Sequence, residues 1–331
     1  MTRLARRTVL AGLASALASP AVAVGDRWAD VAGAARALPQ LHSILVARRG
    51  ETVVAQTFRG PGLDAPANVK SVSKSIVALL LGAAIDRGIV PSVEATLADV
   101  APELVPANAD PRVAGLTLED LVTLRAGLER TSGPNYGEWV ASPNWVADAL
   151  SRPFVAEPGE RMLYSTGSFH ILGATLARTA DRSLLALARD WLGEPLGIDI
   201  PPWSRDPQGY YLGGNEMALT PRAMLKIGEM VRQAGTWDGV QVLSRAWIDA
   251  SLTPVTRSPW SGLGYGYGWF IDETDAGRMA IARGYGGQII ATAPGAEITV
   301  AITSDPTRPA RSAGYFGDLM NLISAQILKW R

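Results

Sequence analysis

A serine and a lysine stand three residues apart at the start of a long apolar run. Ser71 and Lys74 lie within the segment 70–75, Lys-Ser-Val-Ser-Lys-Ser, and the apolar run extends to residue 85. Side chains three apart share one face of a helix, so the Lys74 amine is expected beside the Ser71 hydroxyl. A serine hydroxyl needs a base to become a good nucleophile, and a desolvated lysine can be that base. The neighbouring Ser73 and Ser75 are expected to point elsewhere.

The helix N-terminus adds a second feature of catalytic sites, because its free N–H groups can stabilise an oxyanion. By itself, however, S-x-x-K also fits a serine-rich helix start with a solvated lysine. A Ser-His-Asp triad would need His42 or His170, and both are better explained as packed structural residues. No G-x-S-x-G elbow, P-loop or dinucleotide-binding glycine pattern occurs.

The composition excludes several other classes of function. The 331 residues carry 31 Lys plus Arg against 31 Asp plus Glu, with the positive charges scattered. A chain without a basic field is not expected to bind nucleic acid or an anionic membrane surface. The lack of cysteine excludes disulfides, thiol nucleophiles and cysteine-based zinc sites, and no carboxylate spacing suggests another metal site. No cofactor or metal is expected, and the partner is a small-molecule substrate.

The elements that must position Ser71 follow a sheet–helix–sheet order along the chain. Strands near both ends argue against a βαβ repeat and predict an α+β fold, in which an antiparallel sheet flanked by helices carries an inserted all-helical domain. Residues 24–68 with 256–331 are expected to form the sheet domain, and 69–255 the helical domain. The expected helices are 26–38, 73–87, 118–124, 145–150, 169–180, 184–192, 221–233 and 313–330, and the expected strands are 41–47, 52–58, 266–271, 279–283, 288–293 and 297–303.

The first 23 residues have the pattern of an export signal. Arg3, Arg6 and Arg7 precede the apolar stretch 8–18, and Pro20 leads into Ala-Val-Ala at 21–23. The paired arginines resemble a twin-arginine signal, which exports folded proteins. An uncleaved anchor or an amphipathic helix is the alternative. The expected location is the periplasm or the cell exterior, with no stable membrane partner after cleavage.

Two further motifs follow the S-x-x-K pair in a fixed order. Tyr164-Ser-Thr ends the segment 158–166, and Arg-Gly-Tyr-Gly-Gly-Gln occupies 283–288. With these motifs and four flanking segments, nearly the whole mature chain resembles the penicillin-recognising serine hydrolases, which include class C β-lactamases, related esterases and aminohexanoate-oligomer hydrolases. The resemblance implies a β-lactamase/transpeptidase-like fold. The flanking segments are 116–124, 195–198, 213–222 and 265–270.

The resemblance also implies a role for each motif residue. Ser71 would be the acylated nucleophile and Lys74 its proton partner. Tyr164 would be the shared general base and acid, kept partly deprotonated by the nearby ammonium. The N–H groups of Ser71 and Gly287 would form the oxyanion hole.

Two departures from the family pattern bear on the substrate. Thr166 replaces an asparagine that binds the acyl side of the substrate, and Gly284-Tyr-Gly replaces Lys-Thr-Gly, which removes a cation that binds a carboxylate. Arg283 either substitutes for that cation or is turned away by strand alternation. Tyr285 and Gly286 are expected at the substrate pocket because of their motif.

Loop aromatics are the remaining candidates for the substrate site. Tyr136 and Trp139, with Trp145 and Trp260, either rim a cleft or pack in the core. The sequence thus predicts an exported serine hydrolase that cleaves a carboxylic ester or amide. The alternatives are a β-lactamase or D,D-peptidase, favoured only if Arg283 supplies the missing cation, and a sensor that is acylated without turnover.

Overall fold

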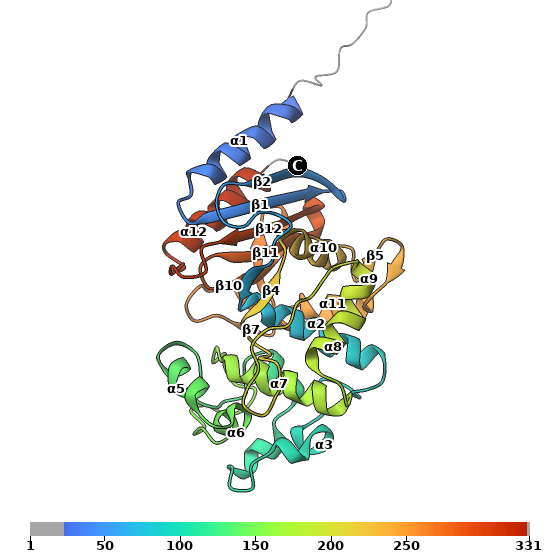
Figure 1. Ribbon diagram of the computed structural model, residues 1–331, viewed down its shortest axis with the longest axis vertical. Helices are drawn as coiled ribbons and strands as arrows, with labels where there is room; N and C mark the ends of the chain where they lie inside the picture. The colour runs from blue at the N-terminus through green and yellow to red at the C-terminus, as the bar shows by residue number, and fades with distance from the viewer. Residues whose placement is uncertain (1–22, 330–331) are drawn as a thin grey trace, which may run out of the picture.

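The computed structural model describes residues 23–329, and its centre is an eight-stranded antiparallel sheet (Figure 1). The strand order is β2-β1-β12-β11-β10-β9-β8-β7, so the first strands of the chain lie beside the last one. Ile44 of β1 lies opposite Ile302 of β12. The strands are β1 (Leu41–Arg48), β2 (Glu51–Thr57), β7 (Thr256–Arg257), β8 (Gly264–Tyr265), β9 (Phe270–Thr274), β10 (Gly277–Gly284), β11 (Gln288–Ala293) and β12 (Ile298–Ser304).

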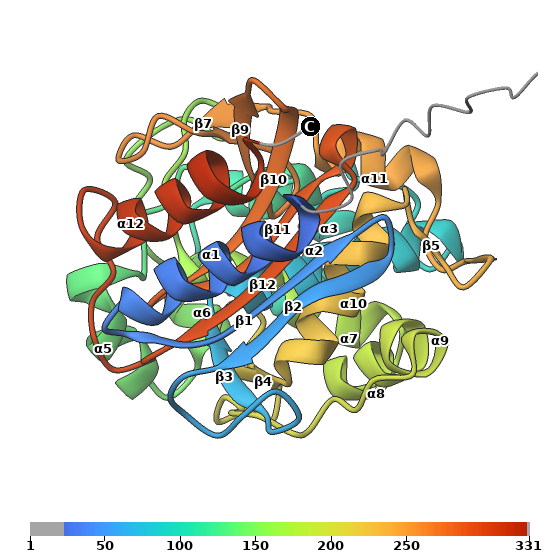
Figure 2. The same cartoon turned by 90° about the horizontal axis from the view of Figure 1, so that it is seen from above.

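Helices cover both faces of this sheet (Figure 2). On one face lie α1 (Ala23–Ala37) and α12 (Tyr315–Asn321), which continues into a π-helical turn at Leu322–Ile327. On the other face pack α2 (Val72–Asp86) and α10 (Pro221–Arg232). Residues 72–84 are all buried, which explains why α2 carries apolar residues on every side after its polar first turn.

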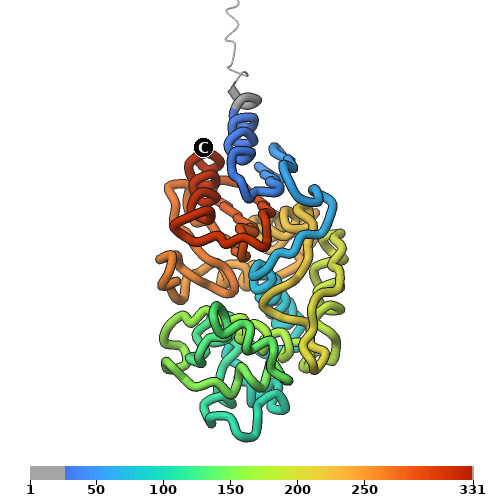
Figure 3. The backbone as a smooth tube through the Cα atoms, turned by 60° about the vertical axis from the view of Figure 1, so that its left-hand side comes forward, coloured from blue at the N-terminus to red at the C-terminus, as the bar shows by residue number. Residues whose placement is uncertain are grey.

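The middle of the chain supplies the remaining helices, and Figure 3 shows its green part as a lobe below the sheet. Two short ribbons, β3 (Ala67–Lys70) with β4 (Met217–Leu219) and β5 (Thr236–Trp237) with β6 (Val240–Gln241), stand apart from the main sheet. The other helices and helical turns are α3 (Leu97–Val100), η1 (Pro102–Leu104), η2 (Pro111–Gly115), α4 (Leu118–Val122), η3 (Gly133–Asn135), α5 (Tyr136–Ala141), α6 (Trp145–Leu150), α7 (Thr166–Thr179), α8 (Leu184–Ala188), η4 (Arg189–Gly193), α9 (Glu194–Leu196) and α11 (Arg245–Ser251).

The predicted α+β architecture is confirmed, with one strand misplaced. The segment 266–271 is not a single strand, because the Gly266 N–H donates to the Trp269 carbonyl and closes a turn between β8 and β9. Its aromatic residues are buried as turn residues, and their β-like composition hid the turn. The division at residues 69 and 255 stays a prediction; α2 and α10, inside the predicted helical range, pack on the sheet.

The predicted export segment lies outside the described residues, except for Ala23 at the start of α1. Across residues 23–329, no helix is both long enough and apolar enough to span a membrane.

Candidate active site

Ser71 is the residue that links β3 to α2. It is the N-cap of α2, with φ −71°. The N–H groups at the start of a helix lack intrahelical partners, so they can donate to an oxyanion near Ser71. Lys74, one helical turn further on, places its Nζ 3.1 Å from Ser71 Oγ. The structure thus brings the predicted serine and lysine together.

The Lys74 amine is buried and meets only neutral groups at hydrogen-bond distance. Lys74 is 1% exposed, and its Nζ lies 2.6 Å from the Gly214 carbonyl oxygen and 3.2 Å from Thr166 Oγ1, besides the contact with Ser71. Burial disfavours the ammonium and lowers the pKa of Lys74 to about 7. A neutral amine has two hydrogens, which suit Gly214 and Thr166, and one lone pair, which then faces the Ser71 hydroxyl.

Tyr164 lies close to both Lys74 and Ser71. The Lys74 Nζ is 4.9 Å from the centre of the Tyr164 ring. Burial raises the pKa of Tyr164, opposed in part by a hydrogen bond with Ser71 and by the charge of Arg283. Burial therefore works against the partly deprotonated phenol that was expected, and the role of Tyr164 as base and acid stays a prediction. The nearby ammonium that was expected as the cause is present only part of the time at neutral pH, because burial lowers the pKa of Lys74 to about 7.

Thr166 is buried and contacts Lys74. The side chain is 4% exposed, and its hydroxyl lies 2.9 Å from Ser132 Oγ as well as in contact with Lys74. The Thr166 N–H also donates to Ser132 Oγ, at 2.8 Å. These contacts do not favour the predicted substrate-binding role of Thr166, which stays a prediction, because its short side chain ends at Lys74 and Ser132.

The third motif forms the turn between β10 and β11. Tyr285 is 52% exposed, as expected for a residue at the rim of a site. Gly286 and Gly287 have φ of 80° and 97°, which favours glycine. The Gly287 N–H, expected in the oxyanion hole, donates to the Gly284 carbonyl at 3.2 Å. In this conformation the turn uses the Gly287 N–H, and its place in the oxyanion hole stays a prediction.

Arg283 points toward the chain segment that precedes α12. Its guanidinium carbon lies 3.5 Å from the centre of the Phe316 ring, and Nη2 lies 3.1 Å from Ser312 Oγ. Burial lowers the pKa of Arg283 to about 10, partly offset by Tyr164, so the group stays charged at neutral pH. These contacts hold the guanidinium on Phe316, and they do not favour the predicted substrate-binding role of Arg283.

Tyr136 and Trp139, the two aromatic residues expected at the substrate site, lie in different surroundings. Trp139 is fully buried and donates its indole N–H to the Trp145 carbonyl at 2.8 Å. Its predicted place at the substrate site is therefore wrong, because it is a core residue. Tyr136 is half-buried, and its hydroxyl accepts from Asn215 Nδ2 at 3.1 Å. Asn215 follows Gly214, so Tyr136 lies beside the segment that binds Lys74.

The segment 213–215 belongs to the site although no sequence-based expectation placed it there. A Cβ on Gly214 would lie 2.8 Å from the Thr166 carbonyl oxygen, and one on Gly213 would collide with the Phe169 carbonyl. Two glycines therefore let the backbone lie on the first turns of α7, with the Gly214 carbonyl at Lys74. His170 is a buried structural residue, as expected: its Nδ1 accepts from the Gly213 N–H at 3.4 Å and its Nε2 lies 3.0 Å from Asp206.

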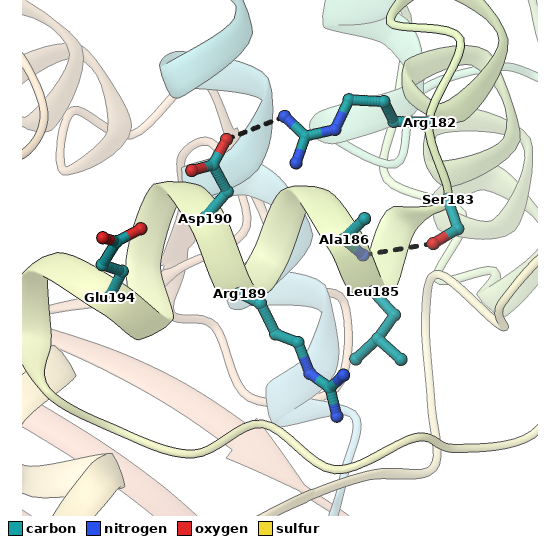
Figure 4. A pocket seen from close by; sticks show the side chains of 7 residues that line it. All are labelled: Arg182, Ser183, Leu185, Ala186, Arg189, Asp190 and Glu194. Atoms are coloured by element: carbon teal, nitrogen blue, oxygen red, sulfur yellow. Dashed lines mark hydrogen bonds and ion pairs between the residues drawn. The ribbon is translucent and has the colours of Figure 1, made fainter.

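A hollow of about 500 Å³ lies elsewhere, on α8 and η4 (Figure 4). It contains an Arg182–Asp190 ion pair at 2.7 Å and none of the site residues above. Within residues 23–329, no group of three or more histidine or carboxylate side chains is arranged to hold a metal ion.

Comparisons with known proteins agree with this geometry. The β-lactamase family model matches residues 23–322. Solved structures with the same fold include EstCE1, a hydrolase with promiscuous acyltransferase activity, at 18% identity, 90% of this chain, 97% of that chain and a TM-score of 0.73. A penicillin-binding protein homologue from Caulobacter crescentus has 20% identity, coverages of 91% and 96% and a TM-score of 0.70. A D-stereospecific amidohydrolase from Streptomyces sp. has 17% identity, coverages of 91% and 98% and a TM-score of 0.69.

None of the curated protein sequences compared with this chain matches it. The family model nevertheless covers nearly all of the described residues, and the β-lactamase/transpeptidase-like fold is shared with these structures. The chain therefore belongs to the β-lactamase family and is a serine hydrolase.

Proposed function

We propose that this enzyme hydrolyses a carboxylic ester or amide through an acyl-enzyme on Ser71. The observation that carries the proposal is the buried Lys74 amine, which lies 3.1 Å from Ser71 Oγ and has a pKa of about 7. A base with a pKa near the working pH is neutral often enough to accept a proton and acidic enough to return it.

Acylation begins when Ser71 Oγ attacks the carbonyl carbon and its proton passes to Lys74. The carbonyl electrons move to oxygen, and the oxyanion is stabilised by the N–H groups at the start of α2. The bond to the leaving group then breaks, and the alcohol or amine leaves with a proton from the Tyr164 phenol. The Lys74 ammonium returns a proton to the Tyr164 phenolate, so both groups are neutral again.

Deacylation consumes one water molecule. Water attacks the acyl carbon and loses a proton to Lys74, while the carbonyl electrons again move to oxygen. The intermediate collapses, the bond to Ser71 Oγ breaks, and Lys74 returns its proton to that oxygen. The products of one cycle are a carboxylic acid and an alcohol or amine.

A substrate that is neutral near the scissile bond suits this site best. Two cations of the site motifs besides Lys74 are engaged: Lys70 pairs with Glu216 at 2.9 Å, and Arg283 lies on Phe316. Tyr285 offers an exposed aromatic surface beside them. The contacts of Arg283 do not favour the β-lactamase or D,D-peptidase alternative, which needs a cation for the substrate carboxylate. Export of the enzyme, supported by the pattern of residues 1–23, is part of the proposal.

Labelling with a fluorophosphonate tests the nucleophile directly. We expect one adduct, mapped by mass spectrometry to Ser71, and no adduct in Ser71→Ala. Lys74→Met should slow the labelling by about 10²–10⁴-fold, because the base is lost. A folded protein with no adduct, or with an adduct that survives in Ser71→Ala, would contradict the proposal.

The same preparation separates the role of Tyr164 from that of Lys74. Tyr164→Phe should slow the hydrolysis of alkyl esters and amides more than that of p-nitrophenyl esters, because p-nitrophenolate leaves without a proton. Equal losses for all leaving groups would exclude Tyr164 as the acid. A single burst of product would favour the sensor alternative, and acylation by penicillins would favour the β-lactamase alternative.

A further inference from the structure

Two residues with left-handed backbone conformations flank the site. Lys70, directly before Ser71, has φ 51°, and Glu216, directly after Asn215, has φ 67°. A side chain in this region is strained, and such strain persists only where surrounding contacts hold it. Both residues belong to the β3–β4 ribbon or its edge, where the register shifts between Asn68 and Lys70. The ribbon therefore bends where the nucleophile begins and where the Lys74-binding segment ends.

Side chains join the two strained residues directly. Lys70 Nζ lies 2.9 Å from Glu216 Oε1, and Asn68 Nδ2 donates to Glu216 Oε2 at 2.5 Å. Asn68 Oδ1 in turn accepts from the Lys70 N–H at 2.9 Å. The side chains of Lys70 and Glu216 are 21% and 27% exposed, so this pair is partly shielded from water. Both carboxylate oxygens of Glu216 are thus bound to residues of β3.

Ser73 makes a second link between the same two segments. Its hydroxyl donates to the Lys70 carbonyl at 2.6 Å and accepts from the Met217 N–H at 3.1 Å. Ser73 is fully buried, so neither bond competes with water. Together, the ion pair and the serine connect the strand before Ser71 to the segment that carries Gly214.

We propose that Lys70 and Glu216 are positioning residues, which hold Ser71 and the Gly214 carbonyl at the correct places around Lys74. This inference rests on the proposed function, because it concerns the geometry of the same nucleophile and base. Neither residue contacts the reacting atoms. The pair acts by keeping two segments, distant in sequence, in register on either side of the Lys74 amine.

The test uses the full chain and three variants: Lys70→Met, Glu216→Gln, and the reversed pair Lys70→Glu with Glu216→Lys. Each single variant should lower kcat for a p-nitrophenyl ester, and the rate of Ser71 phosphonylation, by about 10- to 100-fold, because a small misplacement of reacting groups is costly. KM should change by less than about twofold. The reversed pair should recover a large part of the loss, because the attraction between the two segments is restored.

Arg182→Met and Asp190→Asn are the matched controls, since this ion pair (Figure 4) has a similar length and lies in a hollow that contains none of the site residues. They should leave both rates unchanged. The inference is overturned if the single variants lose no more than these controls, if their losses follow the fraction of unfolded protein measured by thermal melting, or if the reversed pair recovers nothing. Absence of labelling in the wild type would instead overturn the proposed function, and this inference with it.

Discussion

The Lys74 amine links the chemistry of the site to the stability of the protein. Burial without a carboxylate partner makes the ammonium costly, and the amine meets a carbonyl and two hydroxyls instead. The unfolded chain, in which Lys74 has an ordinary pKa near 10.4, binds this proton readily. Between pH 7 and 10, therefore, the unfolded state holds more protons than the folded state.

The free energy of unfolding should rise with pH across this window. The sign follows from linkage: stability increases with pH wherever the unfolded state binds more protons. With a folded pKa of about 7, the wild type should gain about 2–3 kcal/mol relative to Lys74→Met between pH 6 and pH 9. Urea unfolding of both proteins at the two pH values measures this difference. A difference that is constant with pH would show that Lys74 is not buried as an amine.

At the scale of elements, two helical glycines, Gly82 and Gly33, differ in how closely other residues pack against them. Gly82 of α2 faces Trp247 of α11, and a Cβ there would collide with the indole ring. Gly33 of α1 has open space around the position of its missing Cβ. The two positions are thus a matched pair in which the same substitution meets opposite surroundings.

Alanine at these two glycines should have opposite effects on stability. Gly82→Ala should destabilise the protein by roughly 1–3 kcal/mol, because α2 must move away from α11. Gly33→Ala should stabilise it by about 0.5–1 kcal/mol, because alanine favours the helix. Denaturant unfolding compares the two variants. If both are stabilising, α2 and α11 pack less closely than described.

Elements and short-range pairs could be predicted from the sequence, whereas contacts between distant segments could not. The Ser71–Lys74 contact follows from helical spacing alone. Gly214 reaches Lys74 only because two glycines let a remote segment lie on α7, and no local pattern encodes that approach. Trp139 was misplaced for the same reason: its loop-like surroundings hide the core that α6 and α7 build around it.

At the scale of the whole molecule, the proposed export requires that the export machinery recognise the signal before it is cleaved. Arg6 and Arg7 carry the twin-arginine pattern, whereas Arg3 lies outside it. Replacing Arg6 and Arg7 by lysine should keep the enzyme inside the cell, and Arg3→Lys should not. Fractionation of cells, with Ser71 labelling of each fraction, measures the distribution. An unchanged distribution in the double variant would contradict export by this pathway.

Because β1 pairs with β12, the central sheet cannot be completed until synthesis of the chain is almost finished. β1 leaves the ribosome early, but its partner is residues 298–304, which emerge only when the chain is almost complete. Until then α2 has apolar residues on every side and no finished sheet to cover them. A message truncated before β12 should therefore yield a polypeptide that is bound by chaperones or degraded. It should not yield a shorter enzyme of lower activity.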